Sequence, residues 1–545
     1  MQQLIALLKS IPEYRDLSAA LAAGDSAAVT GIGQINRSHM LSGLYQDLKR
    51  PLVVVCQDDL AARRLQQELK DFLGLTAPIL PSRELTFYDT AAASHSWEQK
   101  RLQQLYHLAI GDTPLQIFTW ESMSLRTMPR QVLLDAAFHL EVGKEYPLET
   151  LLSQLTAAGY SRCGMVEGRG QFAVRGGIVD IFSPAAEQPV RAEFFGDELD
   201  TMGYFDPQTQ RRCENIDTAT ILPVSETQPS LHPQEIDGLC KDLRTLIARQ
   251  KRRKHPSLPL IDTLEKDLEG YENGRLHSAA DRYMALIYPE MATAADYIPQ
   301  DALVAVLDHS ALQRTAHTRM EELGMQLDSL LQGGFVAGEL CDFAAQWEDF
   351  CAGLRGKTVV YFDAFGGSTY PEDNPPKQLF PMTAKQLPGY GGNLDTAVSD
   401  LSHYQKMEFG SLVLCGTRRR AELLQQLLHE KGLSAFLCIP LTTLPKPGQI
   451  LLTEGNLPFG MEYPLSKIAV LTEGQLIARG EQKRKPTKKT GSTNRQKLNS
   501  FTDLTPGWEP ATPRPPAPPR RPPRRSRKFD FSYVRPLKTG NTGTG

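Results

Sequence analysis

The stretch from Tyr160 to Pro207 constrains the fold most, because it has the pattern of an antiparallel β-unit. Two short runs rich in β-forming residues, Gln171–Arg175 and Ile178–Phe182, are joined by Gly176-Gly177, a doublet that favours a tight hairpin turn. A third run of the same kind, Val190–Phe195, follows two proline breaks. The sequence therefore predicts consecutive antiparallel strands in this part of the chain.

The faces of these predicted strands carry an unusual set of side chains. Alternate residues of a strand share a face, so Arg191, Glu193 and Phe195 lie on one face of their strand. Arginine and aromatic residues are enriched at the energetic centres of protein interfaces, and Arg175 adds a second arginine. The alternative is that Arg175 pairs locally with Asp180 or Glu193 on a solvated sheet face, since most surface charges contribute little.

The amino-acid sequence of this stretch resembles that of a domain shared by the excision-repair protein UvrB and the bacterial transcription-repair coupling factor. The resemblance rests on GQFAVRGGIVDIFSP (170–184) and RAEFFGDELDTMGYFDPQTQR (191–211). It implies that the domain docks onto UvrA, the expected partner, through four residues: Arg162, Arg175, Arg191 and Phe195. UvrB has a further arginine where this chain has Ala173, so we expect a similar rather than identical contact.

A degenerate phosphate loop precedes this domain. The strand-like run Ala27–Thr30 leads into GIGQINRS, from Gly31 to Ser38, and then into a helical stretch. The spacing is that of the phosphate-binding loop G-x-x-x-x-G-K-[ST], but Asn36 replaces the second glycine and Arg37 replaces the lysine. The glycine lets backbone N–H groups close around phosphates and the lysine reaches them as a compact charge, so we predict an inactive site without ATP.

The whole chain is predicted to be an α/β protein of several domains, since 545 residues exceed what one core supports. A buried-type strand, Pro51–Cys56, and an amphipathic helix, Leu60–Leu73, indicate an α/β first domain. The resemblance implies that this domain is similar to a helicase lobe that has lost ATP binding. The predicted boundaries are 1–130 for the first part of this UvrB-like domain, 131–222 for the inserted β-rich UvrA-docking domain, 223–345 for the return to the first domain, 346–478 for a small α/β third domain opening with Gly356–Phe362, 479–504 for a basic linker and 505–545 for a disordered Pro/Arg-rich tail.

Charge and cysteine usage exclude several classes of protein. The formal net charge of −3 combines an acidic body with a basic end, because 17 Lys and Arg residues and 4 acidic residues follow from Arg479 onward. An acidic body is a poor sequence-independent DNA binder, and the basic run Arg249–His255 is interpreted as a solvated helix face rather than a DNA site. The eight cysteines form no C-x-x-C pair, which argues against metal clusters and disulfides. With no apolar run of membrane length and no secretory signal, we expect a cytoplasmic protein with no metal, no cofactor and no membrane partner.

The resemblance extends over about residues 1–504, up to Ser500–Leu504, and stops there. The following stretch, WEPATPRPPAPPRRPPRRSRK, departs from the family, and a frameshift or a truncated gene model would explain the switch. The complete family member is an ATP-dependent DNA translocase, and the resemblance implies that its RNA-polymerase-binding domain, both motor lobes and its autoinhibitory C-terminal domain are missing here. RNA polymerase and DNA are therefore expected as partners only through those missing domains. The leading hypothesis is a non-enzymatic module that recruits UvrA in transcription-coupled nucleotide excision repair. An ATP-dependent translocase or helicase and a UvrB-like binder of damaged DNA are the alternatives.

Overall fold

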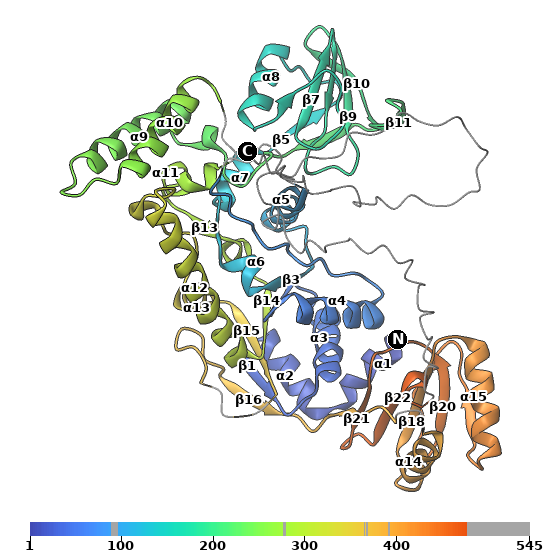
Figure 1. The fold of residues 1–545 in the computed structure, drawn as a ribbon. Coiled ribbons are helices and arrows are strands. Elements are labelled where there is room, and N and C mark those ends of the chain that lie inside the picture. The colour runs from blue at the N-terminus through green and yellow to red at the C-terminus, as the bar shows by residue number, and fades with distance from the viewer. Residues whose placement is uncertain (89–95, 276–278, 365, 367–368, 391–392, 477–545) are drawn as a thin grey trace, which may run out of the picture. The chain divides into compact units, whose positions relative to one another are not determined.

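The first sheet is a six-stranded, parallel sheet that gathers strands from distant parts of the chain (Figure 1). The computed structural model describes residues 1–88, 96–275, 279–364, 366, 369–390 and 393–476. The central strands of this sheet consist almost entirely of buried apolar residues, as expected for parallel strands with helices on both faces. Across the sheet the order is β16 (Gln378–Pro381), β1 (Ala27–Thr30), β15 (Thr358–Asp363), β14 (Leu303–Leu307), β2 (Leu52–Cys56) and β3 (Leu115–Thr119).

Helices from both ends of the first segment and from the return segment cover this sheet. The predicted strand at 51–56 and the predicted helix at 60–73 are confirmed as β2 and α4. Apolar residues of α2, α3 and α4 join the core on one face, and those of α5, α6, α12 and α13 join the core on the other. The bounds are α1 (Gln2–Ala6), α2 (Pro12–Ala22), α3 (Gln34–Leu48), α4 (Asp59–Leu73), α5 (Ser96–Ala109), α6 (Trp120–Ser124), α7 (Arg130–Ala136), α12 (His309–Gln332) and α13 (Trp347–Gly353).

The second sheet is inserted between β3 and β14 and confirms the predicted hairpin and its continuation. Gly176 adopts a positive φ of 63°, which its turn requires, and Gly177 lies so close to β9 that a Cβ there would be 2.7 Å from the Phe194 carbonyl oxygen. One face packs against α8 (Leu148–Ala157) and the strand pair β5 (Phe138–Glu141) and β12 (Thr218–Ile221). The order is β11 (Arg212–Asn215), β10 (Glu198–Phe205), β9 (Val190–Phe195), β8 (Ile178–Ile181), β7 (Gln171–Arg175) and β6 (Ser161–Arg162).

A buried ionic cluster ties the insertion to the first domain. The Arg101 Nε atom lies 2.9 Å from the Glu226 carboxylate, and Arg83 Nη2 lies 2.6 Å from Asp281 Oδ1. Arg83 and Arg101 come from the first segment, whereas Glu226, just after the insertion, and Asp281 come from the return segment. The pairing therefore joins the chain on the two sides of the insertion. The return segment adds α9 (Glu235–Lys251), α10 (Leu258–Glu272), α11 (Met284–Ile287) and β13 (Ala292–Thr293), which pairs with β4 (Arg126–Thr127).

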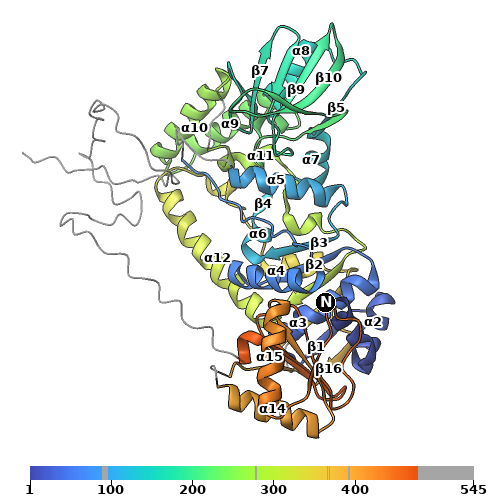
Figure 2. The ribbon, with the colours of Figure 1, turned by 90° about the vertical axis from the view of Figure 1, so that its right-hand side faces the viewer.

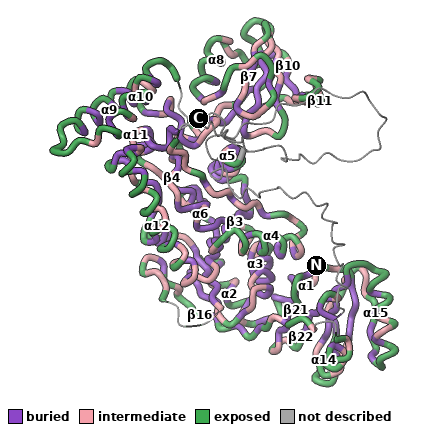
Figure 3. Tube along the Cα trace, viewed as in Figure 1, coloured by how far each residue is buried: buried purple, intermediate pink, exposed green. Residues whose placement is uncertain are grey.

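The basic run at 249–255 lies at the connection between α9 and α10, where the side chains are largely exposed (Figure 3). Arg253 Nη2 donates to Glu339 Oε1 at 2.9 Å, and Lys251 Nζ lies 2.5 Å from Glu265 Oε1. Part of the positive charge is therefore matched by carboxylates of this chain, in keeping with the interpretation as a solvated helix surface.

The third sheet forms a separate α/β layer at the C-terminal end of the described residues (Figure 2). One of its faces packs against α14 (Leu394–Lys406) and α15 (Arg418–Glu430). Its other face shares a core with α1, α3 and the first sheet. The order is β17 (Lys385–Leu387), β21 (Gly460–Tyr463), β22 (Ile468–Thr472), β18 (Gly410–Cys415), β20 (Ile450–Glu454) and β19 (Ala435–Leu437), and α16 (Glu473–Leu476) follows β22.

The prediction that the third domain begins at residue 346, with Gly356–Phe362 as its first strand, is wrong. Most of this run belongs to β15 (Thr358–Asp363), which pairs in parallel with β1 and β14 in the middle of the first sheet. β16 also belongs to that sheet, so the third sheet begins only at β17. A continuous apolar run identifies a buried strand, but its neighbours in a parallel sheet are distant in sequence, and the pattern of one run does not name them.

Two further observations concern the predicted organisation. Among the described residues, no helix is both long enough and apolar enough to cross a membrane. The predicted basic linker (479–504) and the predicted Pro/Arg-rich tail (505–545) lie outside the described residues, as does the departure from the family after Leu504.

Candidate docking face and degenerate phosphate loop

The open face of the second sheet brings two of the predicted arginines together around one carboxylate. The strand register places Asp180 of β8 opposite Arg191 of β9, and Arg175 lies on the same face of β7. Arg191 donates to Asp180 through Nε (2.7 Å to Oδ1) and Nη2 (2.9 Å to Oδ2). Arg175 Nη2 contacts Asp180 Oδ2 at 3.4 Å, so the local pairing that the sequence left open does occur.

The two arginines differ in how far they are committed to this carboxylate. Asp180 is buried, and the Arg191 side chain is 16% exposed, with its guanidinium 4.5 Å from the centroid of the Phe205 ring. Arg191 also donates to the Gln210 carbonyl oxygen at 3.1 Å, and its hydrogen bonds to Asp180 raise its pKa. The Arg175 side chain is 47% exposed. Arg191 therefore holds Asp180 in place, whereas Arg175 presents its guanidinium to solvent.

Phe195 is the most exposed large apolar side chain of this face. It ends β9 and is 82% exposed, next to the turn at Gly196, whose φ is +65°. Its neighbour on the same face, Glu193, is paired with Arg212 Nη1 at 3.0 Å. We call the outward-facing group of Arg175, Ile178 and Phe195 the docking face. An exposed phenylalanine beside a half-exposed arginine is the composition of an interface anchor.

Arg162 does not join the docking face. The parallel register pairs it with Phe172, whose side chain lies in the core on the opposite side of the sheet. Arg162 is exposed at the edge of that other side. Ala173, at the position where UvrB has a further arginine, is buried against Phe182 and Phe205, so this position offers no side chain to a partner.

Two polar side chains of the degenerate phosphate loop, those of Arg37 and Ser38, contact partners within this chain. Arg37, at the lysine position, forms an ion pair with Asp308 at 2.5 Å. The Ser38 hydroxyl donates to Glu68 Oε2 at 2.5 Å, and burial raises the pKa of that carboxyl group. Asn36, at the second glycine position, is fully buried. A functional loop would offer these positions to phosphate and Mg²⁺, so the predicted loss of the site agrees with the contacts.

Gln386 of the third sheet and Met382 of the connection that leads into it cover the same loop. Gln386 Oε1 accepts a hydrogen bond from the Ile35 N–H, near the start of α3, at 3.4 Å. Met382 lies on Gly31, where a Cβ would be 2.7 Å from the Met382 carbonyl oxygen. A cavity of about 260 Å³ beside the loop is lined by the acidic residues Asp58, Glu68 and Asp308 and by the basic residues Arg37 and Arg64. Its Arg37 guanidinium is already paired with Asp308.

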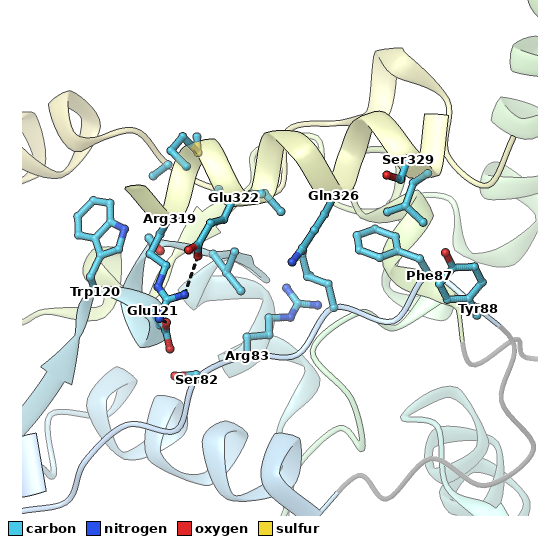
Figure 4. A pocket seen from close by; sticks show the side chains of 18 residues that line it. Ser82, Arg83, Phe87, Tyr88, Trp120, Glu121, Arg319, Glu322, Gln326 and Ser329 are labelled. Carbon is cyan, nitrogen blue, oxygen red and sulfur yellow. Dashed lines mark hydrogen bonds and ion pairs between the residues drawn. The ribbon is translucent and has the colours of Figure 1, made fainter. Parts of the chain in front are cut away.

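A larger cavity, of about 570 Å³, lies between the segment Ser82–Tyr88 and α12 (Figure 4). Its polar rim is formed by Arg319, which pairs with Glu121 and with Glu322. Its other polar lining residues include Ser82, Gln326 and Ser329, and Arg83, which is paired with Asp281. Within the described ranges no three His, Cys, Asp or Glu side chains are grouped so that they could hold a metal ion.

The docking face lies within a segment of the chain that is similar to a known protein family. Residues 138–226 match the family model of the UvrB interaction domain. The transcription-repair-coupling factor of Bacillus subtilis (strain 168) is 24% identical over 511 residues, which cover 93% of this chain and 43% of the relative. The chain resembles the N-terminal part of transcription-repair-coupling factors. The factor of Staphylococcus aureus (strain MRSA252) is 25% identical over 517 residues (93% and 43%), and that of Staphylococcus haemolyticus (strain JCSC1435) is 26% identical over 489 residues (88% and 40%).

The chain thus spans less than half the length of the coupling factors that it matches. All three strands that build the docking face, β7, β8 and β9, lie inside the matched UvrB interaction domain. Sequence reasoning missed the way in which Arg191 is held by Phe205 and Gln210. The signal was present only in part, because strand alternation places Phe205 on that face but the loop carrying Gln210, at a φ of +59°, has no such periodicity.

Proposed function

We propose that this chain is the partner-recruitment part of a transcription-repair coupling factor and that it binds UvrA through the docking face. The observation that carries the proposal is the 82% exposure of Phe195 beside the half-exposed Arg175, within the segment that matches the UvrB interaction domain. A single exposed aromatic side chain is common on protein surfaces, so the proposal depends on Phe195 sharing a sheet face with Arg175 inside the matched segment. In this role the chain acts in transcription-coupled nucleotide excision repair.

The four predicted contact residues have different parts in this proposal. Phe195 supplies the apolar anchor and Arg175 a charged donor that exchanges its long contact with Asp180 for a carboxylate of the partner. Arg191 acts as a positioning residue, because its guanidinium is already held by Asp180, Phe205 and Gln210. Arg162, at the sheet edge on the other side, has a role only if the partner reaches around that edge.

The proposal is tested by measuring UvrA affinity of the full chain and of Phe195→Ala, for example by calorimetry. Truncating an interface anchor costs about 2–4 kcal/mol, so the variant should bind roughly thirtyfold more weakly or worse. Phe436→Ala is the matched control, since Phe436 is also an exposed phenylalanine (52%) but lies on the third sheet. Equal affinity of Phe195→Ala and Phe436→Ala would refute the docking face.

We further propose that residues 1–545 hydrolyse no ATP. In a complete coupling factor, contacts with RNA polymerase and DNA would be made by the RNA-polymerase-binding domain and the motor lobes. Support comes from the phosphate loop, where Arg37 and Ser38 are paired with Asp308 and Glu68. Phosphoryl transfer needs a lysine, a Mg²⁺ ligand and a second lobe acting together. The translocase reading would gain support only from saturable ATP binding that Arg37→Ala abolishes.

A further inference from the structure

The connection between the first and third sheets crosses directly over the degenerate phosphate loop. β16 ends at Pro381 and β17 begins at Lys385, so three residues pass from one sheet to the other. The Met382 N–H donates to the Thr30 carbonyl oxygen at 2.9 Å, which extends the pairing of β16 with β1 up to the loop. We propose that the former phosphate loop has become the receptor that fixes the third sheet on the first domain, so that third-sheet docking and nucleotide entry exclude one another.

The two glycines of the loop are explained by this close approach. Gly31 has a φ of +79°, and a Cβ there would lie 2.7 Å from the Met382 carbonyl oxygen. Gly33 has an ordinary φ of −76°, which any residue adopts, yet its Cβ would lie 2.8 Å from the Gln386 Cβ atom. At Gly33 the absence of a side chain is therefore required by the third sheet and not by the backbone conformation.

The backbone donors of the loop are used in the same way. The first N–H groups of a helix have no partner inside the helix, and in a phosphate loop they bind the phosphates. Here the Gln386 side-chain oxygen accepts from one of them, the Ile35 N–H, at 3.4 Å. A neutral amide thus occupies the position that a phosphate oxygen would take.

A second contact, one helical turn further along α3, binds the third sheet more firmly. His39 is fully buried, with Nε2 2.8 Å from the Leu4 carbonyl oxygen and Nδ1 2.7 Å from the Tyr463 hydroxyl of β21. Because a carbonyl oxygen only accepts, Nε2 carries the proton and Nδ1 accepts from Tyr463. Loop, helix and third sheet are therefore joined by steric fit at Gly31 and Gly33 and by directed hydrogen bonds at Ile35 and His39.

The contact is tested by hydrogen exchange of the full chain. Gly33→Ala should raise the exchange rate of the amides at 385–387 by about tenfold or more, because the third sheet can no longer close on the loop. Gly389→Ala is the matched control: Gly389 lies two residues after the end of β17, and a Cβ there meets nothing within 4 Å. Adding Gln386→Gly to Gly33→Ala removes the clashing Cβ and should restore protection to that of Gln386→Gly alone, whereas no rescue would overturn the proposal.

Two further variants make the proposal independent of how well Gly33→Ala folds. Tyr463→Phe removes one hydroxyl without a clash and should raise exchange in β21, so unchanged protection there would contradict the proposed contact. Asn36→Gly with Arg37→Lys rebuilds the phosphate-loop motif as GIGQIGKS, yet should bind no ATP at millimolar concentration, because Gln386 and Met382 still occupy the loop. Saturable ATP binding by this double variant would refute the exclusion. UvrA affinity should be unchanged in all of these variants, which separates this proposal from the docking face.

Discussion

The docking face and the degenerate phosphate loop both carry arginines paired with carboxylates, but the chain uses them in opposite ways. In the phosphate loop Arg37 is paired with Asp308 and is largely buried, and Ser38 is used by Glu68. On the same side of the second sheet as the docking face, Arg191 forms an ion pair with Asp180. Arg175 stays half-exposed, and Phe195 is largely exposed. A residue that fits a motif therefore indicates a binding function only when its donor or acceptor atoms remain accessible to a partner.

The comparison predicts the largest effect for Arg191→Ala, on stability. Removing Arg191 leaves the Asp180 carboxylate buried with only the long contact from Arg175. Removing one partner of a buried ion pair costs about 3–5 kcal/mol, because the other charge stays buried and unpaired. The free energy of unfolding from urea denaturation should fall by about that amount. The Arg191 side chain is only 16% exposed, so its replacement differs from that of a free surface arginine.

Arg175→Ala is the internal control for this prediction, since Arg175 contacts the same carboxylate from the solvent side. It should lower the free energy of unfolding by about 0.5 kcal/mol or less, as for other exposed ion pairs. Restoring an uncharged core with Asp180→Asn in the Arg191→Ala background should recover part of the lost stability, because the unpaired charge is gone. Equal losses from Arg175→Ala and Arg191→Ala would break the distinction between a positioning and a contacting arginine.

The same two regions show how far sequence reasoning reaches. The hairpin around Gly176-Gly177 and the shared face of Arg191 and Phe195 follow from period-two alternation and turn chemistry, and the structure confirms both. The exposed fraction of the Arg191 side chain could not be predicted, because it depends on contacts with the Gln210 loop and with the Phe205 ring at the end of β10. The coverage of the phosphate loop by Gln386 depends on a contact across 351 positions of sequence, for which no local pattern exists. For the same reason β15 was assigned to the wrong sheet.

The second prediction concerns pH and the buried region around the phosphate loop. Burial lowers the pKa of His39 from 6.5 to about 4, so the folded state favours the neutral ring. The unfolded state then binds more protons between these values, and stability present above pH 6.5 is lost as the pH falls toward 4, by about 3 kcal/mol at pH 4. His39→Gln keeps a donor for Leu4 and an acceptor for Tyr463 without this titration. Its free energy of unfolding should fall less steeply than that of the unchanged chain between pH 6.5 and 4, and parallel curves would contradict the assignment.

The smallest effect is expected for Arg175→Ala on UvrA affinity, and it is the one that decides whether the docking face is charged as well as apolar. A half-exposed arginine that gains a carboxylate partner contributes about 1 kcal/mol, so the dissociation constant should rise roughly fivefold. Because the contact is electrostatic, the difference between the variant and the unchanged chain should shrink as salt screens the charge. Arg175→Lys keeps the charge but not the forked geometry, so its affinity should fall between those of Arg175→Ala and the unchanged chain.

Arg418→Ala is the control. Arg418 is an exposed arginine in an ion pair with Glu422 on helix α15 of the third sheet, so its replacement should leave UvrA affinity unchanged. If Arg175→Ala and Arg418→Ala behave alike while Phe195→Ala loses binding, UvrA reads the apolar anchor alone, and the arginines of this face serve only to build the sheet that presents it.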